Sequence, residues 1–99
     1  KPATPCLATR IPYNTPLEPQ TLQKIEAGED ILHRAGFASC RLRVHGDLAR
    51  IEVEPEKLEQ LIEQREIISR EILALGFSFV TLDLQGLRSG CYDQVEKLI

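Results

Sequence analysis

The sequence contains no tryptophan and no methionine, and only three phenylalanines and two tyrosines among its 99 residues. Its core must therefore be built mainly from Leu, Ile and Val, and 42% hydrophobic residues are enough for one small domain. No apolar run approaches the roughly 20 residues that a membrane-spanning helix needs. The first residues also lack the basic and apolar regions of a signal peptide. We therefore expect no membrane partner.

A basic excess is also missing, because the formal net charge is -3. Proteins that bind nucleic acids usually carry a basic surface, and RNA-binding domains with an open sheet stack bases on aromatic side chains of that sheet. The expected strands of this chain provide no such set of aromatics. We therefore expect no nucleic-acid partner.

Three cysteines are present, Cys6, Cys40 and Cys91, and none of them belongs to a CxxC pair. An odd, widely spaced set argues against a disulfide framework, and the missing pair argues against structural zinc. This usage predicts a reducing, cytoplasmic setting. Cys40 alternates with apolar residues and is expected in the core, whereas Cys91 is interpreted as incidental.

The chain divides into two parts of different composition. Residues 1–18 are rich in Pro and Thr and predict an extended loop, and residues 19–99 predict one α+β domain. No Met starts the chain, and residues 1–5 have the composition of the middle of a protein. We therefore expect a fragment or an excised domain of a longer protein.

Two amphipathic helical stretches have proline at their start and glycine at their end. The first runs from Pro19 to just before Gly36, and the second from Pro55 to just before Gly76. Proline in the first turn and glycine past the last turn are the usual boundary residues. The apolar period near 3.6 indicates faces that point to the core, and a face that binds a partner is the alternative.

Alternating residues predict strands over 40–45, 48–53 and 80–85. The element order is helix, strand, strand, helix, strand, followed by a short C-terminal helix over 92–99. This order predicts a ferredoxin-like two-layer α+β sandwich whose first strand is missing or is supplied by residues 7–14.

The tight turn at Gly46 and Asp47 sets the register of the first two strands. A two-residue turn pairs His45 with Leu48, so one side of the hairpin is apolar and must meet the helices. The apolar side consists of Leu42, Val44, Ala49, Ile51 and Val53.

The other side of the hairpin is strongly charged. In this register Arg43 faces Arg50, and Arg41 faces Glu52. Like charges directly across a hairpin are unfavourable, and arginine suits bidentate contacts with phosphate or carboxylate. One interpretation is a phosphate-binding face. The other is a solvated face on which Glu52 and Asp83 neutralise the arginines.

Two further positions have the residue types of a site. Cys6 lies in a proline-flanked loop four residues before Arg10, where a thiol can act as a nucleophile or sulfur carrier or can simply be buried and inert. Glu29 and Asp30 lie beside Gly28 in the first helix, where they can bind a metal, balance the arginines or belong to a solvated face.

Three ordered segments, over residues 5–13, 41–53 and 81–90, resemble the C-terminal half of the LarE family. These proteins are ATP-dependent sacrificial sulfur transferases of the PP-loop superfamily. The resemblance covers nearly the whole chain. It implies that a pyridinium dicarboxylate mononucleotide is adenylylated and then receives sulfur, as a precursor of the nickel-pincer cofactor. Cys6 is then the candidate sulfur donor, and it becomes dehydroalanine.

The resemblance also implies roles for charged residues. Arg10, Arg41 and Arg43 match positions that line a phosphate site, and Glu29 and Glu52 match acidic positions near a bound metal. The sheet pattern adds Arg50 to the expected phosphate and substrate contacts.

The phosphate-binding PP-loop itself, with a pattern like Ser-Gly-Gly-x-Asp-Ser, is absent from this sequence. The expected partners are therefore an N-terminal ATP-binding PP-loop domain of the parent, a nucleotide substrate and further copies in a homo-oligomer. ATP and a divalent metal belong to that parent, and we expect no cofactor and no complete activity in the isolated chain. The alternative function is an oligomerisation or binding module of a PP-loop ATPase, without chemistry of its own.

Overall fold

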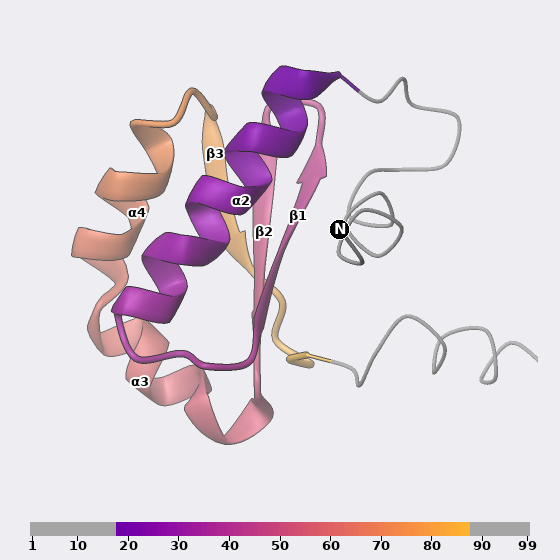
Figure 1. Cartoon of the computed structure of the whole chain (residues 1–99). Helices are drawn as coiled ribbons and strands as arrows, with labels where there is room; N and C mark the ends of the chain where they lie inside the picture. Colours follow the sequence, from indigo (N-terminus) through magenta and orange to yellow (C-terminus); the bar gives the residue numbers. More distant parts are fainter. Residues whose placement is uncertain (1–17, 88–99) are drawn as a thin grey trace, which may run out of the picture.

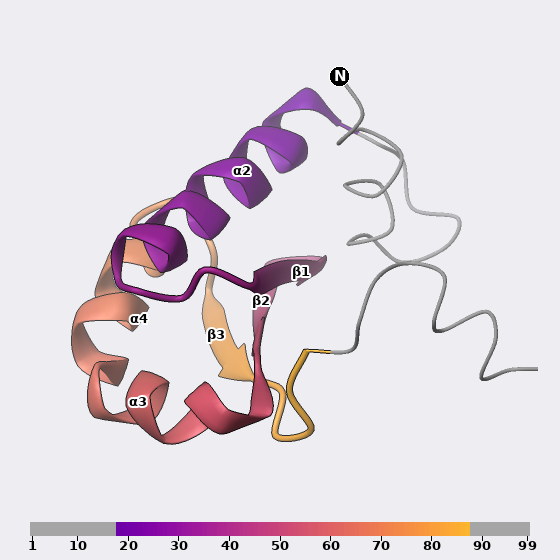
Figure 2. The same ribbon diagram turned by 60° about the horizontal axis from the view of Figure 1, so that its bottom comes forward.

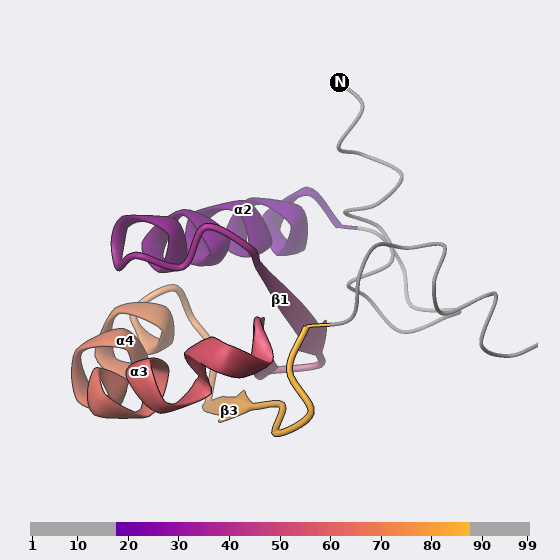
Figure 3. The same cartoon turned by 90° about the horizontal axis from the view of Figure 1, so that it is seen from below.

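The computed structural model describes residues 18–87 and shows a two-layer α+β fold (Figure 1). The helices lie on one side of a three-stranded sheet, as the view along the layers shows (Figure 3). The elements in order are α2 (Pro19–Arg34), β1 (Cys40–His45), β2 (Leu48–Val53), the 3-10 helix η1 (Pro55–Lys57), α3 (Leu58–Glu63), α4 (Arg65–Leu73) and β3 (Phe79–Leu82). The predicted class and element order are confirmed. Residues 1–17, the possible strand over 7–14 and the expected helix over 92–99 lie outside the described residues.

The sheet order is β1-β2-β3, with β1 antiparallel and β3 parallel to β2. The chain passes from β2 to β3 through η1, α3 and α4, which cover the sheet. In a ferredoxin-like sheet the strand before the first helix lies between these two strands. Within residues 18–87, β2 and β3 instead pair directly, so the sheet has three adjacent strands around a central β2.

The hairpin register is as the turn predicted. His45 pairs with Leu48, Arg43 with Arg50, and Arg41 with Glu52. Gly46 has a φ of 63°, in the left-handed region that a tight hairpin turn requires. The turn thus determines which side chains share each face of the sheet.

The core lies between the helices and the sheet. Cys40 is buried there, as predicted, and α2 contributes the fully buried Ile25 and Leu32. Gly28 brings α2 close to β1, because a Cβ at this position would be only 2.4 Å from Cδ2 of Leu42. The buried apolar residues are Ile25, Ile31, Leu32, Phe37, Cys40, Leu42, Val44, Ala49, Ile51, Val53, Leu61, Ile68, Ile72 and Phe77.

The second helical stretch is not the continuous helix that the pattern predicted. It is divided into η1, α3 and α4, and Figure 2 shows α3 and α4 meeting at an angle. At the break, the N–H of Gln64 donates to the carbonyl of Leu61, three residues back, over 3.0 Å. Leu61 and Ile68 are both buried on either side of it. The sequence has no Gly or Pro here, so the bend follows from how both segments pack rather than from a local helix breaker.

Among the helices of residues 18–87, none has the length and apolar character needed to cross a bilayer.

Candidate functional site

The side of the sheet that faces away from the helices carries polar residues from all three strands. Strand alternation places them together, since paired residues of neighbouring strands point to the same side. We call this side the charged face and define it as Arg41, Arg43, His45, Arg50, Glu52, Thr81 and Asp83.

Glu52 lies at the centre of the charged face. Nε of Arg43 donates to Oε2 of Glu52 over 2.7 Å, and an Arg50 Nη2 contacts the same oxygen at 3.4 Å. The Glu52 side chain is only 3% exposed and that of Arg43 15%. The two arginines that face each other across the hairpin therefore share one buried carboxylate, which offsets their mutual repulsion.

Asp83, directly after β3, adds a second carboxylate beside Arg50. Its Oδ2 lies 3.8 Å from Nε of Arg50, whose side chain is 36% exposed. Arg43 and Arg50 are thus matched in charge by Glu52 and Asp83. The sheet pattern had two interpretations, a phosphate-binding face and a face on which acids neutralise the arginines. Within the described residues, the contacts of Arg43 and Arg50 correspond to the second.

Arg43, Arg50, Glu52 and Asp83 form a cluster of charged side chains on this face. Two buried polar atoms of the cluster have no hydrogen bond among the described residues. They are Nε of Arg50 and Oε1 of Glu52. A buried acceptor without a partner is costly, and a donor or a cation beside Oε1 would satisfy it. This oxygen is therefore the atom of the charged face that is best placed to accept a further ligand.

Arg41 lies apart from the cluster. Its Nη1 donates to the carbonyl of Cys40 over 3.0 Å, and within residues 18–87 it forms no ion pair. Its side chain instead lines a hollow of about 480 Å³ at the end of the sheet where β1 begins and β2 ends. Of the three arginines of the charged face, Arg41 is therefore the one whose guanidinium contacts no carboxylate in the described part of the chain.

Glu29 has a structural contact that the sequence did not predict. Its Oε2 accepts a hydrogen bond from the backbone N–H of Leu42 over 2.9 Å. Leu42 belongs to β1, an outer strand of the sheet within residues 18–87, and the close approach of α2 at Gly28 brings the carboxylate there. Glu29 thus covers a backbone donor of an edge strand, which limits pairing with other chains.

The two acids that were expected near a metal have different contacts. Glu29 binds the backbone of β1, whereas Glu52 binds arginines on the charged face. Within residues 18–87 no three His, Cys, Asp or Glu side chains form a group that could hold a metal ion. A role of either acid at a metal therefore stays a prediction. Cys6 and Arg10 lie outside the described residues.

His45 completes the charged face at the end of β1. Partial burial lowers its pKa below the ordinary 6.5, and the positive charges of Arg50 and then Arg43 lower it further. The imidazole is therefore neutral near pH 7. The sequence marked His45 only as a hairpin residue, and its alternation with Arg41 and Arg43 was the signal that places it on this face.

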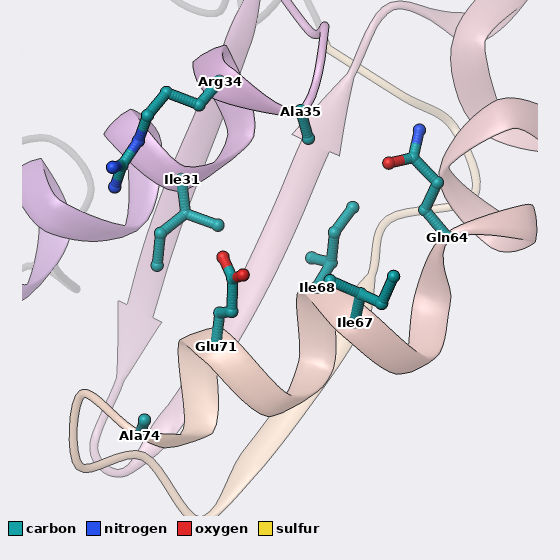
Figure 4. Close-up of a pocket in the computed structure, with 8 residues that line it drawn as sticks. All are labelled: Ile31, Arg34, Ala35, Gln64, Ile67, Ile68, Glu71 and Ala74. Carbon is teal, nitrogen blue, oxygen red and sulfur yellow. The ribbon is translucent and has the colours of Figure 1, made fainter.

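A hollow somewhat larger than the one beside Arg41 lies elsewhere, between α2 and α4 (Figure 4). Its volume is about 540 Å³, Ile31 and Ile68 form apolar walls, and Arg34 and Glu71 lie at its sides. None of the predicted site residues lines it. It is a feature of the helical layer and is separate from the charged face.

Comparison with known proteins finds no matching family model. The chain is 37% identical over 97 residues to an uncharacterized protein of Synechocystis sp. and 33% identical over 88 residues to one of Methanocaldococcus jannaschii. It is also 37% identical over 90 residues to the pyridinium-3,5-bisthiocarboxylic acid mononucleotide synthase of Lactiplantibacillus plantarum. These matches cover 96%, 89% and 91% of the chain and 36%, 34% and 33% of the respective relatives. The chain thus spans about a third of the length of these relatives, and the match to the synthase supports the LarE-like relationship that three sequence segments predicted.

Proposed function

We propose that this chain is the C-terminal, substrate-binding part of a LarE-like sulfur transferase that acts in the cytoplasm on an adenylylated pyridinium mononucleotide. The observation that carries this proposal is the 37% identity, over 91% of the chain, to a protein named as a synthase of a bisthiocarboxylic pyridinium mononucleotide. Such a product requires sulfur transfer to carboxyl groups. An enzyme that makes it also needs a site for the phosphate of the mononucleotide, and guanidinium groups are suited to bind phosphate.

In this proposal Arg10, Arg41, Arg43 and Arg50 contact the phosphate and substrate. Arg41 has the guanidinium most available for this contact, because it has no ion pair within residues 18–87. Arg43 and Arg50 are oriented by Glu52 and add positive charge beside the site.

Cys6 is the proposed sulfur donor. Its Sγ attacks the adenylylated carboxyl carbon and displaces AMP, which gives a thioester between substrate and protein. Removal of the Cα proton then breaks the Cβ–Sγ bond. The sulfur leaves as the substrate thiocarboxylate, and residue 6 remains as dehydroalanine.

The parent protein is proposed to supply an N-terminal PP-loop domain that binds ATP and a divalent metal. The unsatisfied, buried Oε1 of Glu52 supports a cation or a bound water close to the charged face. Glu29 is the second acid proposed near such a metal.

Mass spectrometry of the full-length parent after turnover tests the donor role. The peptide that contains Cys6 should lose one sulfur and match dehydroalanine, while the peptide that contains Cys91 stays unchanged as an internal control. Product formation with Cys6 intact would show that the sulfur comes from another source.

A second function is an assembly module beside a nucleotide-binding domain. The exposed apolar side chains favour it, since Ile67 of α4, Phe79 of β3 and Leu84 in the turn after β3 are open to solvent in the described chain. Titration with a nucleoside monophosphate, followed by NMR, separates the two functions. Shifts centred on Arg41, Arg43 and Arg50 support the site, whereas linewidths that grow with protein concentration, without such shifts, support the module.

A further inference from the structure

The hollow beside Arg41 is built by three separate segments of the chain. Residues before β1, residues after β2 and the turn after β3 converge on it, with a volume of about 480 Å³. Clefts that bind small molecules usually measure about 300–1,000 Å³. The residues that line it are Ala38, Ser39, Arg41, Glu54, Pro55, Glu56 and Leu87.

The walls of the hollow are fixed by backbone contacts. The N–H of Leu87 donates to the carbonyl of Val53 over 2.7 Å, and the N–H of Lys57 donates to the carbonyl of Glu54 over 2.8 Å. Gly86 has a φ of 84°, and a Cβ there would lie 2.9 Å from the carbonyl oxygen of Val53. The turn after β3 is therefore packed tightly against the end of β2, which holds the hollow in shape.

Residues of opposite charge line the hollow, and within residues 18–87 they do not pair with one another. Arg41 supplies the positive charge, and Glu54 and Glu56 supply two carboxylates. Within residues 18–87 neither carboxylate has a hydrogen bond or an ion pair, and neither pairs with Arg41 although both line the same space. A ligand that fits between them must therefore offer an anionic group on one side and hydrogen-bond donors on the other.

A ribonucleotide carries both groups on one small molecule. Its phosphate suits a guanidinium, and its ribose hydroxyls donate to carboxylates, which is a usual way in which proteins bind ribose. We propose that Glu54 and Glu56 bind the ribose hydroxyls of a nucleotide whose phosphate contacts Arg41. This inference rests on the proposed function and assigns the ribose contacts of that same site.

The two acids also determine the selectivity of the hollow. Two carboxylates near Arg41 weaken the attraction for an anion that brings no donors of its own. Inorganic phosphate should therefore bind weakly, and each ribose hydroxyl that reaches a carboxylate should add affinity. A hydrogen bond to a charged group corresponds to about a tenfold or greater gain in binding.

The test compares AMP, 2′-deoxyAMP, 2′,3′-dideoxyAMP and inorganic phosphate on the 99-residue chain, with amide shifts of Ser39, Arg41 and Glu54 as the readout. AMP should bind about tenfold more tightly than 2′-deoxyAMP and about a hundredfold more tightly than the dideoxy compound, a factor of about ten for each hydroxyl lost. The variant Glu54→Gln/Glu56→Gln should lose this difference and keep or strengthen its binding of dideoxyAMP. The matched control is Glu59→Gln, which removes the same charge at an exposed position of α3 outside the hollow.

The outcomes separate the ribose contact from the proposed function. Equal affinities for AMP and dideoxyAMP, with shifts at Arg41, would refute the ribose contact and leave the phosphate contact in place. An AMP preference that survives in the double variant would refute the role of these two acids. Absence of shifts at Arg41 with every compound would refute the phosphate contact and the ribose contact together.

Discussion

At the scale of single residues, Glu52 determines whether the two facing arginines of the sheet can coexist. Its buried carboxylate contacts both Arg43 and Arg50, and its side chain is almost completely shielded from water. Removing one member of a buried ion pair leaves an uncompensated charge, which costs more than the pair contributes. We therefore expect the stability of the sheet to be sensitive to replacement of Glu52.

Replacement Glu52→Ala should lower the free energy of unfolding by about 3 kcal/mol, because it removes the buried carboxylate that Arg43 contacts, whereas the more exposed Arg50 keeps Asp83. Urea denaturation measures this loss. Phosphate at high concentration should restore part of the stability, since an anion can occupy the vacated place. The control is Asp83→Asn, which affects a longer contact to the more exposed Arg50 and should cost under about 1 kcal/mol. Equal losses in both variants would contradict the central role of Glu52.

His45 should make the stability of the chain depend on pH. Burial and the arginines lower its pKa in the folded state below 6.5, so the unfolded chain binds more protons below that pH. The free energy of unfolding should therefore have its full value above about pH 6.5 and decrease as the pH falls below that value. Denaturation at several values between about pH 5 and pH 7.5 measures this slope. His45→Gln should reduce the slope, His33→Gln should not, and an unchanged profile in the first variant would show that His45 is not responsible.

At the scale of secondary-structure elements, the packing of α2 on β1 depends on Gly28. The glycine removes the side chain that would collide with Leu42, and the next residue, Glu29, covers the N–H of the same leucine. One short segment of α2 thus sets both the distance between helix and sheet and the protection of an outer strand.

Replacement Gly28→Ala should destabilise the fold although alanine favours helices. The gain in helix propensity is about 1 kcal/mol, whereas forcing a methyl group against the fully buried Leu42 typically costs about 1–3 kcal/mol. Denaturation of Gly28→Ala, Leu42→Val and the double variant forms a cycle. The cost of the alanine should be smaller in the Leu42→Val background, and a cost that does not change would show that the two side-chain positions are not in conflict.

The elements also show what the sequence can and cannot predict. The hairpin register was predictable, because Gly46 and Asp47 define a two-residue turn and strand alternation then assigns every face. The bend at Gln64 and the contact between Glu29 and Leu42 were not, since both arise from the packing of segments that are distant in sequence. The sequence also could not predict that the guanidinium groups of Arg41 and Arg43 lie apart, because this too depends on side-chain packing. Alternation places their Cβ atoms on one side, but the neighbouring carboxylates decide where each guanidinium lies.

At the scale of the whole molecule, the chain corresponds to about a third of the length of its relatives and contains no PP-loop pattern. The proposed division of labour follows from this. The proposal assigns activation of the substrate with ATP to the remaining part of the parent, and phosphate binding and the sulfur donor to this chain.

This division predicts that the chain can perform the second half of the reaction when the first half is done for it. A chemically prepared acyl adenylate of a pyridinium carboxylate mononucleotide should convert Cys6 of the 99-residue chain to dehydroalanine in a single turnover without ATP. The reason is that the adenylate already provides the leaving group that the thiolate must displace. Mass spectrometry measures the loss of sulfur from the Cys6 peptide and the release of AMP.

Two variants make this prediction specific. Cys6→Ser removes the sulfur and should give no thiocarboxylate, while Arg41→Gln keeps the thiol and should slow the reaction by weakening the hold on the phosphate. Unchanged kinetics in Arg41→Gln would mean that the phosphate is held elsewhere. An intact Cys6 in the presence of the adenylate would mean that the sulfur-transfer step itself requires groups from the rest of the parent, and the boundary between the two half-reactions would then not coincide with the boundary of this chain.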